Sequence, residues 1–231
     1  MSLASMDKDT GHAERMDGIY RYQRHIYDVT RKYYLLGRDR TIRALNVPAG
    51  GTLLEMGCGT GRNLLLASRH FPQARLFGLD ISREMLAQTA RNFRGVCTVP
   101  PTMPHCIVAD ATAFSAADFG EDGFDRILIS YALSMIPDWE AAVDAALAAL
   151  KPEGELHIVD FGQQEGLPTW FRDGLRAWLR RFHVSPRARA EAVLQEKAAL
   201  AGRTLSFQRL YRGYAWTACI KPATEKGGAH G

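Results

Sequence analysis

The segment Thr52–Asp80, TLLEMGCGTGRNLLLASRHFPQARLFGLD, decides the fold of this chain. Its two short apolar runs, 52–56 and 76–79, have the composition of buried parallel strands. A turn with three glycines follows the first run, and the apolar positions of 63–71 then recur at helical spacing. Strand, glycine turn, helix and strand in this order predict a nucleoside-binding half of a doubly wound α/β sheet.

The glycine spacing indicates which nucleoside this turn accepts. Gly57, Gly59 and Gly61 are separated by single residues, whereas the dinucleotide pattern G-x-G-x-x-G would require glycine at position 62, which is Arg62. Asp80 ends the second strand, where a carboxylate can hold the hydroxyls of a ribose. A purely structural turn in another α/β protein is the alternative interpretation.

The pattern Glu55-x-Gly57-x-Gly59-x-Gly61 resembles the first motif of class I S-adenosylmethionine (SAM) methyltransferases. The resemblance extends over about residues 45–221. It implies a Rossmann-like α/β fold with a seven-stranded, mostly parallel sheet, an antiparallel last strand and helices on both faces. It also implies SAM as the cofactor, because the acid at Glu55 suits the cationic methionyl ammonium and would repel a pyrophosphate.

Further cofactor contacts are expected after the second, third and fourth strands. Ile81 and Met85 are placed to flank the adenine, or are ordinary core residues. Asp110-Ala111 ends the third strand, where the resemblance implies a hydrogen bond from the adenine amino group; Asp110 could instead cap the following turn. Ser130 ends the fourth strand, at the sheet edge where ligands bind.

The chain of 231 residues fits one α/β domain with a small added element. Tyr33 and Arg38 lie in the helical segment that precedes the core, and we expect both to bind the SAM carboxylate; a helix that simply packs on the sheet is the alternative. The expected organisation is a disordered start (1–15), a helical lid (16–44), the SAM-binding domain (45–221) and a disordered tail (222–231).

Composition narrows the cellular setting. Hydrophobic residues make up 46% and charged residues 23% of the chain, as in ordinary soluble proteins, and the longest apolar run, 127–136, is too short to span a membrane. The polar N-terminus does not resemble a signal peptide. Four cysteines without paired spacing favour free thiols in the cytoplasm and predict no metal site. No DPPY-like tetrapeptide follows the fourth strand, so nucleic acid is not an expected partner.

The segment 168–183, PTWFRDGLRAWLRRFH, predicts an amphipathic helix with a cationic side. Phe171 and Trp178 belong to its apolar face, and Arg172 and Arg180 to the other side. Tryptophan beside arginine is typical of helices that lie on anionic bilayers. A helix that covers the sheet with solvated arginines is an equally good interpretation.

The segment 20–40, YRYQRHIYDVTRKYYLLGRDR, resembles the N-terminal signature of bacterial betaine-lipid N-methyltransferases. That resemblance implies three SAM-dependent methylations of the amine of diacylglyceryl-homoserine. Aromatic rings bind the resulting cation well, so Tyr20 and Tyr131 are candidate catalytic residues, with Tyr27 and Tyr33 as further cage members and His25 as a candidate base.

Two other functions remain open at this stage. One is a class I methyltransferase for a soluble small molecule, in which the 168–183 helix is only a lid. The other is a SAM-binding domain without catalysis. The lipid hypothesis predicts a protein that is cytoplasmic or peripheral on the inner face of the membrane.

Overall fold

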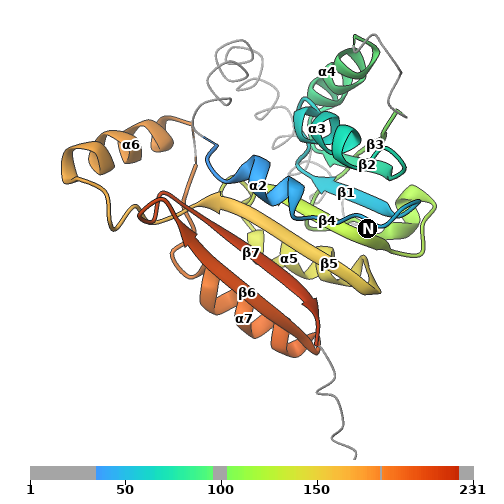
Figure 1. Ribbon diagram of the computed structural model, residues 1–231. Helices are drawn as coiled ribbons and strands as arrows, with labels where there is room; N and C mark the ends of the chain where they lie inside the picture. The colour runs from blue at the N-terminus through green and yellow to red at the C-terminus, as the bar shows by residue number, and fades with distance from the viewer. Residues whose placement is uncertain (1–34, 96–102, 183, 224–231) are drawn as a thin grey trace, which may run out of the picture.

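The computed structural model describes residues 35–95, 103–182 and 184–223 (Figure 1). The predicted disordered N-terminus and most of the predicted helical lid lie outside these residues, as does the tail beyond residue 223. The candidate residues Tyr20, His25, Tyr27 and Tyr33 are therefore not described.

Seven strands form one sheet in the order β3-β2-β1-β4-β5-β7-β6. Strands β1 to β5 pair in parallel, and β7 lies between β5 and β6, antiparallel to both. This confirms the predicted mostly parallel sheet with an antiparallel last strand. The strands are β1 (Thr52–Met56), β2 (Arg75–Asp80), β3 (His105–Val108), β4 (Phe124–Ser130), β5 (Leu150–Phe161), β6 (Arg203–Leu210) and β7 (Ala215–Pro222).

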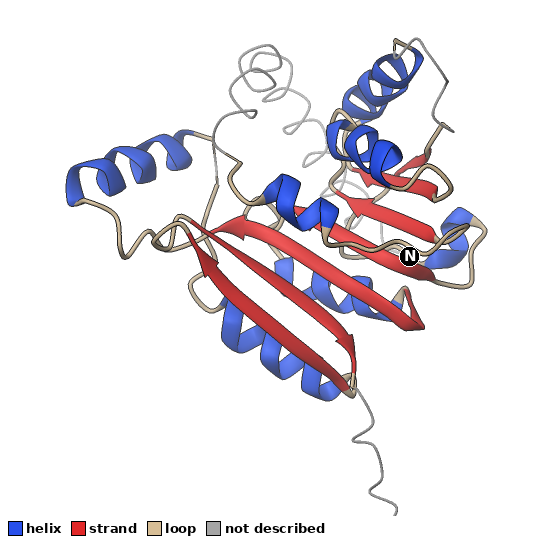
Figure 2. Cartoon of the chain, viewed as in Figure 1, coloured by secondary structure: helices blue, strands red, loops and turns tan. Residues whose placement is uncertain are grey.

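Helices cover both faces of the sheet, as Figure 2 shows, and each layer encloses its own apolar core. One layer packs Ile42, Leu64 and Phe93 on Leu53 and Leu128. It consists of α2 (Arg38–Arg43), α3 (Arg62–His70) and α4 (Arg83–Arg94). The opposite layer consists of α5 (Trp139–Ala148), α7 (Ala190–Leu200) and the short 3-10 helix η1 (Ala116–Phe119).

The helix α6 (Thr169–Arg181) stands beyond the end of the sheet in Figure 1. It exists as predicted, but it is exposed over most of its length, with Leu179 as its buried anchor. Phe171, which we expected on the apolar face, is exposed. Arg176 on this helix donates to the carbonyl of Gln163 and the side chain of Gln164. Within the described residues, no helix combines the length and apolar character needed to cross a membrane.

The strand β5 is longer than the sequence predicts. Leu150 pairs with Phe124 and Glu155 with Arg126, so residues 151–154 bulge out of the register with β4, where the sequence predicts a turn. The guanidinium of Arg203 on β6 donates to the carbonyls of Lys151, Pro152 and Gly154. A cation from a distant strand therefore satisfies the carbonyls of the bulged residues.

Candidate functional site

A cavity opens at the carboxyl ends of the central strands, where ligands bind in open α/β sheets. It encloses about 1020 Å³ of empty space, which includes the open solvent at its mouth. Most of its wall is apolar, and three carboxylates supply charge. Its lining comprises Gly57, Gly59, Leu79, Asp80, Ile81, Met85, Ala109, Asp110, Ala111, Thr112, Tyr131, Ala132, Met135, Ile136, Pro137 and Asp138.

The glycine turn forms one wall of this cavity. Gly57, Gly59 and Gly61 have φ angles of 67°, 55° and 72°, a backbone conformation that residues other than glycine rarely adopt. A Cβ on Gly57 would lie 2.8 Å from the Cβ of Ala132, and one on Gly61 would lie 2.5 Å from Thr89. Glycine is therefore required both for the backbone conformation and for the space between the turn and its neighbours.

Asp80 closes β2 and is 9% exposed, with its remaining surface toward the cavity. Its Oδ2 accepts a hydrogen bond from the amide of Gly59 at 2.8 Å, and its Oδ1 accepts from the amide of Ser82 at 2.9 Å. The carboxylate thereby fixes the glycine turn to the start of α4. Carboxylate oxygens carry further lone pairs, so Asp80 can also accept hydrogen bonds from ligand hydroxyls.

The adenine-side candidates also reach the cavity. Ile81, Met85 and Ala111 line it beside Asp110. Oδ1 of Asp110 accepts from both the amide and the hydroxyl of Thr112 at 2.8 Å, so the capping role that the sequence left open is real. The second oxygen, Oδ2, has no such partner among the described residues and is the atom left for an amino group.

A smaller hollow adjoins the glycine turn on the side of α2. Arg38 and Glu55 are buried there with Ser130, and Gly57 borders this hollow as well as the large cavity. Oε1 of Glu55 accepts a hydrogen bond from the side-chain amide of Asn63 at 2.6 Å. The hydroxyl of Ser130 is buried without a hydrogen-bond partner among the described residues. Opposite charges and an unsatisfied hydroxyl suit a zwitterionic group such as an amino acid.

Tyr131 follows β4 with a φ angle of 54° and lines the cavity. Its hydroxyl donates to the carbonyl of Leu36 at 2.5 Å, which ties the start of the described chain to the end of β4. Burial raises the pKa of Tyr131 well above its ordinary value, and Asp160 adds to the effect. The phenol therefore stays protonated at neutral pH, so it offers a ring face and a tether rather than a base.

Sequence reasoning missed the segment 131–138 as a continuous wall. Residues Met135, Ile136 and Pro137 line the cavity, although nothing in their pattern distinguishes them from a connecting loop. Asp160 of β5 holds this segment, because its Oδ2 accepts from the amide of Ser134 at 2.9 Å. The signal available in the sequence was Asp160, a polar residue at the end of its strand, which could have indicated that a neighbouring segment is held there.

Cys58 lies inside the glycine turn and is buried. Its hydrogen bond with Cys106, together with burial, raises the pKa of the Cys58 thiol well above its ordinary value. It is therefore a small packing residue and not a nucleophile.

The family described as "Methyltransferase domain" matches residues 53–154, which include the glycine turn and four of the seven strands. Demethylmenaquinone methyltransferase of Mycobacterium marinum is 32% identical over 167 residues, 70% of this chain and 64% of that protein. The Bacillus licheniformis enzyme of the same name is 25% identical over 158 residues, 66% of this chain and 65% of that protein. The aligned part of the chain thus spans slightly less than two thirds of these relatives.

A solved structure supports the same fold. The plantazolicin methyltransferase complexed with a desmethyl substrate analogue and S-adenosylhomocysteine has a TM-score of 0.65 at 15% identity. The match covers 94% of this chain and 99% of that one. Residues 53–154 are therefore a methyltransferase domain with the class I, SAM-dependent fold. The relatives named above act on quinones, so the narrower resemblance to betaine-lipid enzymes rests on residues 20–40 alone.

Proposed function

We propose that this protein is a SAM-dependent N-methyltransferase that methylates the amine of a lipid head group, with diacylglyceryl-homoserine as the acceptor. The methyltransferase domain and the cavity at the carboxyl ends of the strands support the reaction class. The exposed aromatic rings of α6 are the observation that carries the lipid acceptor, since they offer a bilayer a contact on a helix that follows β5.

The residues present fit the donor. Gly57 and Gly59 line the cavity without side chains, so a ligand can approach their backbone. In our proposal Asp80 holds the ribose hydroxyls, Ile81 and Met85 flank the adenine, and Asp110 accepts from its amino group. Arg38, Glu55 and Ser130 hold the charged methionyl end, where the unsatisfied hydroxyl of Ser130 gains a partner.

When bound, SAM supplies an electrophilic methyl group on a sulfonium. The chain's own contribution is alignment of the acceptor and exclusion of water by the apolar wall of Met135, Ile136 and Pro137. The acceptor nitrogen must be neutral to attack, so its proton must leave first. We propose His25 for that step, and Tyr20 and Tyr131 for holding the resulting cation against their ring faces.

The helix α6 supports a lipid acceptor. Trp170 is 76% exposed and Phe171 40% exposed at its N-terminal end, with Arg172, Arg180 and Arg181 along the same helix. Exposed aromatic rings beside arginines favour contact with the interface of an anionic bilayer. α6 also follows the carboxyl end of β5, on the side of the sheet where the cavity opens.

A second candidate acceptor is a quinone, because the relatives named above methylate demethylmenaquinone. One experiment separates the two acceptors. The protein is incubated with methyl-labelled SAM and either diacylglyceryl-homoserine or a demethylated quinone in detergent, and the products are analysed by mass spectrometry. Label on the head-group nitrogen supports our proposal, label on the quinone ring supports the second candidate, and label in neither rejects both.

The membrane contact has its own test. We expect Trp170→Ala combined with Phe171→Ser to reduce the affinity for anionic vesicles, measured by sedimentation, by about thirtyfold, since each aromatic ring buried in the interface contributes on the order of 1 kcal/mol. Leu200→Ser is the matched control, because Leu200 is an 82% exposed apolar residue on α7. Equal vesicle binding by all three proteins would remove α6 from the proposal.

A further inference from the structure

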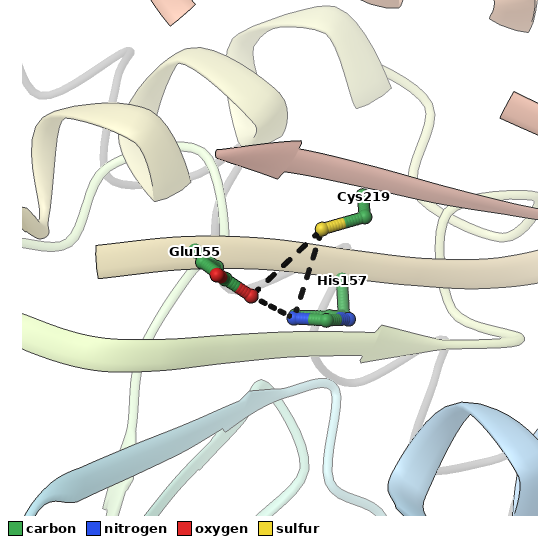
Figure 3. Close-up of side chains that lie close together, drawn as sticks. All are labelled: Glu155, His157 and Cys219. Atoms are coloured by element: carbon green, nitrogen blue, oxygen red, sulfur yellow. Dashed lines mark hydrogen bonds and ion pairs between the residues drawn. The ribbon is translucent and has the colours of Figure 1, made fainter. Parts of the chain in front are cut away.

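Three potential metal ligands meet on the sheet face that carries α2, away from the residues that line the cavity. They are Glu155 and His157 of β5 and Cys219 of β7, as Figure 3 shows. Nε2 of His157 lies 2.9 Å from Oε2 of Glu155, and Sγ of Cys219 lies 3.9 Å from that oxygen and 3.8 Å from that nitrogen. Three different ligand types thus converge on one point.

The sheet itself sets this arrangement. Glu155 and His157 are two residues apart on one strand, so their side chains leave the same face. Cys219 is the register partner of His157 on the neighbouring antiparallel strand. The site is therefore built on paired strands in the interior of the sheet and not on a loop, which holds the ligands in place before any ion arrives.

The spacing suits a tetrahedral zinc ion. Bond lengths of about 2.0–2.3 Å to oxygen, nitrogen and sulfur place ligand atoms about 3.4–3.6 Å apart around such an ion. The three distances of 2.9, 3.8 and 3.9 Å lie within about half an ångström of that range.

The ligand set selects the class of metal. A thiolate and an imidazole favour zinc and its neighbours in the transition series over magnesium or calcium, which prefer all-oxygen sites. With three protein ligands, a fourth position remains for water. We propose that Glu155, His157 and Cys219 form a zinc-binding site that joins β5 to the antiparallel strand β7.

Nearby groups have opposite effects on the binding of a cation at this site. The hydrogen bond from His157 lowers the pKa of Glu155, and Arg126 adds to this effect, so the carboxylate is ionised and ready to bind a cation. Arg126 lies 3.7 Å from Glu155 and repels an incoming ion, but its guanidinium donates to the carbonyls of Leu45, Asp125 and Asn46, which hold it in place.

Binding must release a proton from the thiol. Burial raises the pKa of Cys219 to about 11, and Glu155 contributes, so the metal-free thiol is protonated at neutral pH. The ion replaces that S–H proton with a metal–sulfur bond, while His157 moves its remaining proton to Nδ1 so that Nε2 can coordinate. The balance is one divalent cation bound and about one proton released.

Cobalt(II) and zinc(II) test the proposal on the full, tag-free chain. We expect Co²⁺ to produce a near-ultraviolet thiolate charge-transfer band that saturates at one ion per chain and disappears when Zn²⁺ is added. Cys219→Ser and His157→Gln should weaken binding by at least about a hundredfold, since loss of even an outer partner of a metal ligand costs about 10- to 100-fold. Cys106→Ser, a thiol elsewhere in the sheet, should keep the band.

A second measurement guards against a variant that fails to fold. In weakly buffered solution the wild-type protein should release about one proton for each zinc ion bound, and its thermal midpoint should rise with zinc. Absence of a charge-transfer band in the wild-type protein would overturn the proposal, as would a band that persists in Cys219→Ser or vanishes in Cys106→Ser. The trio would then be a hydrogen-bonded link between the strands.

Discussion

The ends of β2 and β5 carry the same chemical group with different outcomes. Asp80 and Asp160 each accept two backbone hydrogen bonds at the same edge of the sheet. Asp80 faces the cavity, whereas Asp160 lies behind segment 131–138 and is 1% exposed. Burial raises the pKa of Asp160 to about 6, and hydrogen bonds from Phe161 and Ser134 offset only part of that rise. Access to the cavity thus distinguishes Asp80, which can bind a ligand, from Asp160, which holds the segment that forms the cavity wall.

The largest effect should appear in the pH dependence of stability. The native state holds the proton of Asp160 up to about pH 6, whereas an unfolded Asp loses it near 3.8, so stability falls as the pH rises between these values. The difference corresponds to roughly 3 kcal/mol. The unfolding free energy of the wild type relative to Asp160→Asn should therefore decline by up to about that amount between pH 4 and pH 7 in urea titrations.

Asp125→Asn provides a control of opposite sign. Burial acts to raise the pKa of Asp125, but hydrogen bonds from Thr52 and Lys151 outweigh burial and lower it. The advantage of the wild type over this variant should therefore grow with pH. A pH-independent difference between wild type and Asp160→Asn would show that Asp160 is ionised across the range, and the contrast with Asp80 would disappear.

The next effect concerns the donor. Asp80→Ala should weaken SAM binding by about 1–3 kcal/mol, or roughly 5- to 150-fold, because a ligand hydroxyl loses a charged acceptor. Isothermal titration calorimetry measures this, with Asp144→Ala on the exposed surface of α5 as the control. An unchanged affinity in Asp80→Ala would remove this carboxylate from the site.

The smallest effect sharpens the role of Tyr131. Tyr131→Phe keeps the ring on the cavity wall but removes the hydrogen bond to the carbonyl of Leu36. We expect a loss of about 1 kcal/mol in unfolding free energy. Tyr211→Phe, at an exposed hairpin position, should cost nothing measurable. Loss of methyl transfer in Tyr131→Phe with SAM affinity intact would instead give the hydroxyl a role in the reaction.

Local pattern was sufficient for the core of the fold. The glycine turn and the two strands that flank it follow from residues adjacent in sequence, and the structure confirms them. Asp80 and Met85 reach the cavity for the same reason, because strand ends and first helical turns fix their direction.

What the sequence could not show depends on distant partners. The carbonyls of Lys151 and Gly154 find their donor in Arg203 of the distant strand β6. Arg176 leaves the solvated side of α6 because Gln163 and Gln164 offer acceptors. The trio of Glu155, His157 and Cys219 arises from the pairing of β5 with β7, which no spacing rule along the chain reveals.

The position of β7 has a consequence for biosynthesis. Although β7 follows β6 along the chain, it fills an interior slot of the sheet, between β5 and β6. Until it arrives, the paired backbone edge of β5 is bare, and the apolar side chains Leu156 and Ile158 lie along it. Unpaired strand edges of this kind promote aggregation. A nascent chain stalled before residue 215 should therefore depend on chaperones far more than the finished protein does.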